Sequence, residues 1–257
     1  VQRKKIVITL LMIYCSLSVC SAHSLVREII NFNREWKYTC GDPENAEQPD
    51  FSDDNWENIG LPHSFSIPYF MSKDFYMGYG WYRKSFVLTE EDLNKKLFLE
   101  FDGVFREAEI FINGIKAGSH AGGYTGFPVD ISSLVRAGDN KVAVRVNNLW
   151  KADAAPRAGE HVFSGGIYRN VRLVKKSPLH IDWYGVFVTT PGLSENSGRS
   201  SQVRISTDIC NQTPREANYK LVTEIRDADN KLVASASAKK RIEANSTGNC
   251  EQTVSYT

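Results

Sequence analysis

The 257-residue sequence lacks an excess of charge of either sign, and this excludes whole classes of partner. It contains 31 Lys and Arg against 30 Asp and Glu, for a formal net charge of +1. Such a chain has neither the basic field that nucleic acid requires nor a polybasic block for an anionic membrane surface. With 42% hydrophobic and 24% charged residues, the composition predicts a water-soluble globular protein of one or two domains, without nucleic acid as a partner.

Cysteines at metal-binding spacing are also missing. The chain has five cysteines, and no two of them form a CxxC pair, so neither a zinc site nor a dense disulfide scaffold is indicated. We therefore expect no metal ligands and no cofactor. For Cys210 and Cys250 two alternatives stay open, a bridge between two strands or free buried thiols, and we expect the free thiols.

The sequence has no hydrophobic run long enough to be a comfortable membrane span, because residues 6–19 (IVITLLMIYCSLSV) are too few. This run is preceded by the basic residues Arg3, Lys4 and Lys5 and followed by the small residues Ser21 and Ala22. That order is typical of a secretory signal peptide, here residues 1–22, and predicts export to the periplasm or the extracellular space. Two alternatives remain: a lipid anchor on Cys20, or a buried N-terminal element.

What the chain does have is period-two alternation of apolar residues, which predicts an all-β fold. The clearest strand segments of the first half are residues 81–88, 97–103, 108–114, 141–148 and 167–174. Residues 111–131 (FINGIKAGSHAGGYTGFPVDI) predict a hairpin turn at Asn113-Gly114, a second strand, and a glycine-rich loop leading into a third. Residues 90–96 and 53–59 are expected as short helical connectors. Long loops between the strands favour a jelly-roll-like sandwich over a barrel.

From Pro178 onward the strand spacing becomes more even. Five regular strands are expected, at residues 179–190, 202–211, 219–227, 231–240 and 250–257. This rhythm is typical of an immunoglobulin-like sandwich, which has about seven strands. We therefore expect a signal peptide (1–22), a first sandwich (23–177) and a truncated immunoglobulin-like sandwich (178–257), together a fragment of a longer polypeptide.

Six motifs follow one another in a fixed order along the first half of the chain. They are Asp53, Asp54 and Trp56, then LPHSF (61–65), GYGWYRKSFVL (78–88), LEFDGVFREAEIFING (99–114), NKVAVRVNN (140–148) and FSGGIYRNVRLV (163–174). This order resembles the sugar-binding N-terminal domain of glycoside hydrolase family 2. The resemblance covers roughly residues 26–176, and the region after Pro178 looks like the immunoglobulin-like domain that follows in that family.

The resemblance implies an exported, retaining hydrolase of oligosaccharides or polysaccharides, with a β-galactosidase as the first candidate. Its catalytic (β/α)₈ barrel, with an acid/base and a nucleophilic glutamate, would follow these two domains, which would brace it and shape one wall of its pocket. No catalytic residue is expected within this chain. A free-standing carbohydrate-binding module and a cell-surface adhesion module remain as alternatives, because a sandwich alone decides no function. A homo-oligomer is also left open.

The resemblance further implies that two loops contact substrate. In the loop at 157–166, Glu160 holds the position of a sugar-binding carboxylate, with His161 beside it; a solvated loop charge is the alternative. In the loop that precedes residues 80–83, Asp74, Tyr76 and Tyr79 can bind or stack on a sugar. For Tyr79, as for Trp81, packing in the core is the favoured expectation.

The loop at 119–127 is expected mainly as a connection, because its glycines lack the Lys-Ser/Thr ending of a phosphate cradle. They would let Tyr124 and Phe127 pack on the sandwich. His120 and Tyr124 remain secondary candidates for contact with a sugar or another domain. The charged residues of the neighbouring motifs, Arg106, Glu107 and Arg169, are expected to form a structural ion pair.

Overall fold

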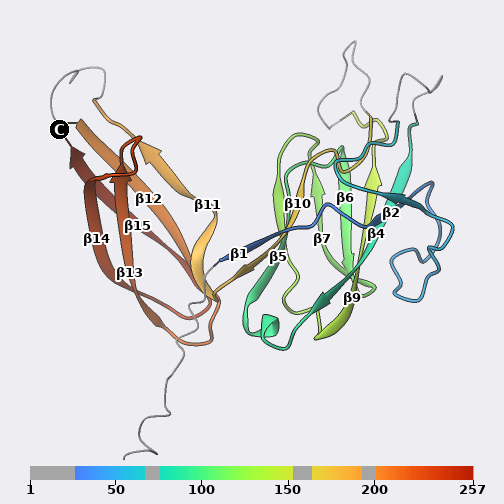
Figure 1. Ribbon diagram of the computed structural model, residues 1–257, viewed down its shortest axis with the longest axis horizontal. Coiled ribbons are helices and arrows are strands. Elements are labelled where there is room, and N and C mark those ends of the chain that lie inside the picture. The colour runs from blue at the N-terminus through green and yellow to red at the C-terminus, as the bar shows by residue number, and fades with distance from the viewer. Residues whose placement is uncertain (1–26, 67–75, 153–163, 193–200, 257) are drawn as a thin grey trace, which may run out of the picture.

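The protein is built from strands in two separate stacks (Figure 1). The structure, a computed structural model, describes residues 27–66, 76–152, 164–192 and 201–256. Within these ranges there is no α-helix, one 3₁₀ turn spans Asp92–Asn94, and no helix is long and apolar enough to cross a membrane. The predicted all-β, sandwich-like fold is therefore confirmed. We call strands β1–β10 the first unit and β11–β15 the second unit.

The first unit consists of a six-stranded and a four-stranded antiparallel sheet. The larger sheet has the order β3-β2-β4-β9-β6-β7, formed by Glu57–Ile59, Trp36–Cys40, Tyr79–Leu88, Gly138–Asn147, Glu107–Ile112 and Ile115–Ala121. The smaller sheet has the order β1-β10-β5-β8, formed by Glu28–Asn31, Val171–Lys176, Lys96–Phe101 and Phe127–Asp130. Each of the five alternating segments expected in this half contains a strand, although the strand expected at 167–174 begins only at Val171.

The core of the first unit lies between these two sheets. Along β9, Val142, Val144 and Val146 are fully buried, and they belong to the same apolar cluster as Trp36 and Leu99. Each such side chain stabilises the fold by about 1.5–3 kcal/mol through burial. The indole of Trp36 also donates a 2.7 Å hydrogen bond to the carbonyl of Phe32, so its polar atom is satisfied inside the core.

Part of the outer face of the six-stranded sheet is covered by the segment 41–56, and Arg83 of β4 holds this cover in place. The Arg83 side chain is 0% exposed, and its Nε donates to Asp53 at 2.8 Å. Its other nitrogens donate to the carbonyls of Ala46, Gln48 and Phe51. The pattern Asp53-x-x-Trp56 thus serves the fold. The helical connector expected over 53–59 is wrong, because this stretch turns and then enters β3 at Glu57.

The second unit contains the five expected strands. β11, β12 and β15 (Leu179–Thr189, Ser201–Asn211, Ser246–Tyr256) form one sheet, and β13 and β14 (Ala217–Arg226, Leu232–Ile242) form the other. Cys210 and Cys250 are buried and free. They lie on neighbouring strands but out of register, because Cys210 is opposite Thr247 and Cys250 is opposite Thr207. The bridge alternative is therefore wrong, and the free-thiol prediction is confirmed.

Replacing Arg83 by Met should lower the free energy of unfolding by about 3 kcal/mol, because Asp53 and three loop carbonyls lose a buried donor. Urea denaturation followed by tryptophan fluorescence measures this. Lys116→Met is the control, since the Lys116 side chain is 50% exposed and its ion pair with Glu109 is worth about 0–1 kcal/mol. Equal losses in the two variants would contradict the anchoring role of Arg83.

Candidate functional site

The predicted substrate residues belong to two loops of the sequence whose described flanking residues lie together at one end of the first unit. Asp74, Glu160 and His161 lie outside the described residues, and Tyr76 is described. The residues that flank both loops are also described, at 63–66, 76–78, 148–152 and 164–167. These flanking residues show where each loop leaves the sandwich.

Hydrogen bonds tie the bases of the two loops together. The amide of Phe65 donates to the carbonyl of Gly165 at 2.8 Å, and the amide of His63 donates to the carbonyl of Ile167 at 2.9 Å. The hydroxyls of Ser64 and Ser164 are hydrogen-bonded to each other. Two segments that are about 100 residues apart in sequence therefore run side by side as they enter the loops.

Asn148, which is buried at the end of β9, makes a second tie. Its side-chain nitrogen donates to the carbonyl of Tyr76 at 3.0 Å, and its side-chain oxygen accepts from the amide of Gly78 at 2.8 Å. Asn148 thus bonds two residues that follow the first loop, Tyr76 and Gly78, to the end of β9, where the chain continues toward the second loop. We call the residues of these ties, 63–66, 76–78, 148 and 164–167, the rim.

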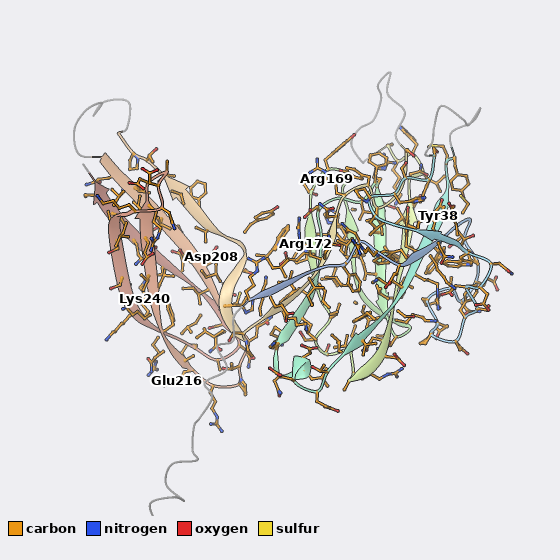
Figure 2. The ribbon with its side chains drawn as sticks, in the orientation of Figure 1. Tyr38, Arg169, Arg172, Asp208, Glu216 and Lys240 are labelled. Atoms are coloured by element: carbon orange, nitrogen blue, oxygen red, sulfur yellow. The ribbon has the colours of Figure 1, made fainter. Side chains whose placement is uncertain are left out.

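An aromatic cluster lies beneath the rim. The ring of Phe65 stacks on those of Tyr38 and Tyr82 and meets the edge of Tyr76, with centroid distances of 5.7, 6.4 and 5.8 Å. A Cβ atom at position 165 would collide with the Phe65 ring and come within 2.8 Å of the Asn148 Cβ. Residue 165 must therefore be glycine for the two loop bases to approach this closely. Figure 2 shows Tyr38 and Arg169 at this end of the unit.

The cluster also holds a histidine that stays neutral. His63 Nδ1 is hydrogen-bonded to the hydroxyl of Tyr82 at 2.9 Å, and its ring lies 4.5 Å from that of Tyr38. Burial lowers the pKa of His63 to about 4 and raises the pKa of Tyr82 well above its ordinary value. At neutral pH this pair contributes hydrogen bonds to the rim and no charge.

Comparison with known proteins decides what the first unit is. The family described as "Glycosyl hydrolases family 2, sugar binding domain" matches residues 22–177. The chain belongs to glycoside hydrolase family 2.

Relatives within family 2 have more than one activity in their names. A β-galactosidase of Bacteroides ovatus is 34% identical over 241 residues, which are 89% of this chain and 27% of that enzyme. A β-glucuronidase of Formosa agariphila is 32% identical over 81% of this chain and 24% of its own length. The crystal structure of a Bacteroides uniformis β-glucuronidase matches with a TM-score of 0.84 at 30% identity, over 90% of this chain and 28% of that one. The chain thus spans about a quarter of the length of these relatives.

Tyr76 is the one predicted substrate residue of this family 2 chain that the structure describes. Its hydroxyl donates to the carbonyl of Tyr79 at 2.8 Å and accepts from the amide of Gly41 at 3.1 Å. The hydroxyl is therefore engaged within the fold, which leaves the half-buried ring as the part of Tyr76 that can face a sugar. The role of Tyr76 stays a prediction, as do those of Asp74, Glu160 and His161.

The secondary candidates lie around the rim without forming one site. The ring of His120 stacks on Phe127 at 4.1 Å and burial lowers its pKa, whereas Tyr124 is 59% exposed and touches Phe105 only edge-on. Phe127 packs in the core as predicted, and the expected packing of Tyr124 is wrong. At position 123 a Cβ would collide with the Phe105 ring, so this glycine does serve close packing.

Glu107 forms the expected structural ion pair at a strand end, with Lys151 at 2.6 Å and not with Arg106 or Arg169. Arg106 is buried and donates to the carbonyl of Leu149, and the guanidinium of Arg169 lies over its neighbour, the ring of Tyr168. In the part of the chain that is described, no group of three or more His, Cys, Asp or Glu side chains could hold a metal ion.

The structure adds His63, Phe65 and Asn148 to the site. The first two belong to the motif at residues 61–65, which carries the family resemblance but shows no pattern that assigns roles to its members. Asn148 looks like the last residue of a strand in the sequence. Its role depends on which loop the strand ends against, which only the sheet order reveals.

We expect the imidazole of His63 to remain neutral down to about pH 5. An unfolded histidine takes up a proton near pH 6.5, whereas folded His63 does so only near pH 4. Between about pH 6.5 and pH 4 the unfolded state therefore binds more protons than the folded state. The free energy of unfolding falls as the pH decreases through this range. NMR titration measures the midpoint, with His63→Gln identifying the signal; a midpoint above pH 6 would contradict the burial of this ring.

Proposed function

We propose that the chain is the non-catalytic N-terminal part of a secreted, retaining family 2 glycosidase. The catalytic glutamates would lie in a barrel outside this chain, about 5 Å apart as retention requires. Family membership supports this proposal, together with the rim, which ties together the bases of the two loops that the family resemblance assigns to substrate. The first unit would shape one wall of the pocket, and both units would brace the barrel.

We further propose that the enzyme acts on β-galactosides within oligosaccharides or polysaccharides. The β-galactosidase of Bacteroides ovatus supports this substrate class, because 89% of the chain aligns with it. β-Glucuronides are the second candidate, since a β-glucuronidase aligns at nearly the same identity. These two substrates differ in the carboxylate at C6, so a direct comparison of rates separates them.

In the complete enzyme, Glu160→Gln should lower kcat/KM for 4-nitrophenyl β-galactoside at least tenfold. Glu160 is proposed to accept hydrogen bonds from sugar hydroxyls, with His161, Asp74 and Tyr76 as further substrate contacts. A hydrogen bond to a charged group is worth about 1.5–3 kcal/mol, which corresponds to that factor or more. The rates of the native enzyme and the variant are compared at matched substrate concentrations.

Glu90→Gln is the control for this experiment, because Glu90 is an exposed carboxylate that precedes the 3₁₀ turn and lies beyond the opposite end of β4 from the first loop. Unchanged kinetics for Glu160→Gln would remove this residue from the site. Faster hydrolysis of 4-nitrophenyl β-glucuronide by the native enzyme would replace the galactoside assignment. Inversion of the anomeric centre, followed by NMR, would overturn the proposed mechanism.

Export is proposed from the first 22 residues, with basic residues before an apolar run and small residues after it. The mature protein should begin at His23 and be recovered outside the cytoplasm, as mass spectrometry of its N-terminus can measure. A lipid-modified N-terminus at Cys20 would support the anchored alternative instead. A full-length N-terminus on cytoplasmic protein would contradict export.

A further inference from the structure

A groove of about 520 Å³ lies on the outer face of the six-stranded sheet, away from the core. Its floor comes from β6, β7 and β9, and its sides come from Tyr79 of β4 and the segment 149–151. It occupies the part of the outer face beyond the 41–56 cover, whose residues do not line it. In Figure 1 these strands lie in the right-hand stack.

Strand register determines which side chains reach this groove. Glu109 is opposite Arg145, and Asn147 is opposite both Glu107 and Tyr79. The intervening residues of β9 and β6, such as Val146 and Ile110, point into the core, so these five point outward. The floor is therefore lined with carboxylate, guanidinium and amide groups, which can accept hydrogen bonds from sugar hydroxyls or donate to them.

Aromatic surface lies beside these polar groups. Trp150 is 60% exposed and lines the groove. Tyr79 is half-buried, and the guanidinium of Arg145 lies 4.0 Å from the centre of its ring. An exposed indole beside fixed hydrogen-bonding groups matches a pyranose, which has an apolar C–H face and a periphery of hydroxyls.

The charges of the groove cancel. Glu107 pairs with Lys151 at 2.6 Å, and Glu109 pairs with Lys116 at 2.5 Å and with Arg145 at 2.9 Å. Arg145 also forms an ion pair with Asp42. Three cations thus meet three carboxylates, and no cation of this cluster lacks an acidic partner. This balance favours a neutral ligand over an acidic one.

Polar lining also argues against a protein partner on this surface. Protein interfaces are depleted of charged residues at their centre, whereas this groove has charged side chains across its floor. The ion pairs hold those side chains in place before any ligand arrives, which lowers the entropy cost of binding. A small polar ligand gains most from such a surface.

We propose that this groove is a second glycan-binding site, distinct from the rim, that holds neutral pyranose units of an oligosaccharide or polysaccharide. Trp150 supplies the stacking platform, and Glu107, Glu109, Arg145 and Asn147 bond to the sugar hydroxyls. The site needs no catalytic residue. It would therefore serve this chain equally as part of an enzyme or as a separate module.

The test is isothermal titration calorimetry of the purified chain with neutral β-linked tetrasaccharides of galactose, glucose, mannose and xylose, and with tetragalacturonate as the acidic probe. At least one neutral probe should bind saturably, and at least tenfold more tightly than the acidic one. No saturable binding of any neutral probe at 1 mM, or preference for the acidic one, would overturn the proposal.

Trp150→Ala should weaken the binding at least tenfold, and Trp150→Phe should restore part of it by keeping a smaller ring. Tyr184→Ala is the control, because Tyr184 is an aromatic residue on the second unit that is more exposed than Trp150, at 82%. Circular dichroism checks that each variant folds. Loss of binding in Tyr184→Ala with none in Trp150→Ala would place the glycan elsewhere and overturn the assignment.

Failure here and failure of the proposed enzyme can be told apart. Glu160→Gln should leave tetrasaccharide binding to the chain unchanged, because the proposal assigns that binding to Trp150 and to the polar side chains of β6 and β9. Conversely, Trp150→Ala in the complete enzyme should leave kcat/KM for the small substrate 4-nitrophenyl β-galactoside unchanged. A loss of both properties in either variant would show that groove and rim are one site.

Discussion

The alternation of side chains along β9 is the constraint on which both faces of the first unit depend. Val142, Val144 and Val146 are buried between the sheets, so Arg145 and Asn147 must project from the opposite face. A shift of register by one residue would turn all of these side chains over. Because β9 pairs with β4 on one side and β6 on the other, its register also sets the outer residues of both neighbours.

The outer face then divides into a closed half and an open half, and two arginines show the difference. Arg83 is 0% exposed under the 41–56 segment, whereas Arg145 on the adjacent strand is 28% exposed. Burying Arg83 costs a large desolvation free energy, which only its full set of acceptors offsets. The ion pairs of Arg145 add little to stability because water screens them. The half covered by residues 41–56 therefore stabilises the fold, and the uncovered half, which contains Arg145, is available for the proposed glycan binding.

Sequence patterns predicted most of the fold because burial of one sheet face leaves a period-two signal. The signal is strong in β9 and β4, which have ten residues each. The signal fails in β3, because three residues are too few to show alternation. The segment before β3 is fixed instead by the hydrogen bonds of Asp53 with Arg83 and Lys37. The groove is invisible in the sequence, since Glu109 and Arg145 become neighbours only through the pairing of β6 with β9.

The candidate site was predicted in part, for a related physical reason. Family resemblance pointed to the two loops, but it could not show that Ser64 and Ser164, a hundred residues apart, are bonded to each other. Nor could it show that Tyr124, an aromatic residue in a glycine-rich loop, remains exposed while Phe127 is buried. Contacts of this kind depend on the order of strands within a sheet, which a single sequence does not reveal.

The rim and the core are joined by direct contacts, so the core fixes the bases of the two loops. Phe65 belongs to the loop base, yet its ring packs on Tyr38 and Tyr82, which are members of the main core cluster. The backbone around it is held by hydrogen bonds to residues 165 and 167. The core therefore holds the base of each loop in place. A substitution within either loop can alter the contacts that the loop makes with a ligand without disturbing the sheets. Specificity can in this way diverge among relatives that share the same sandwich.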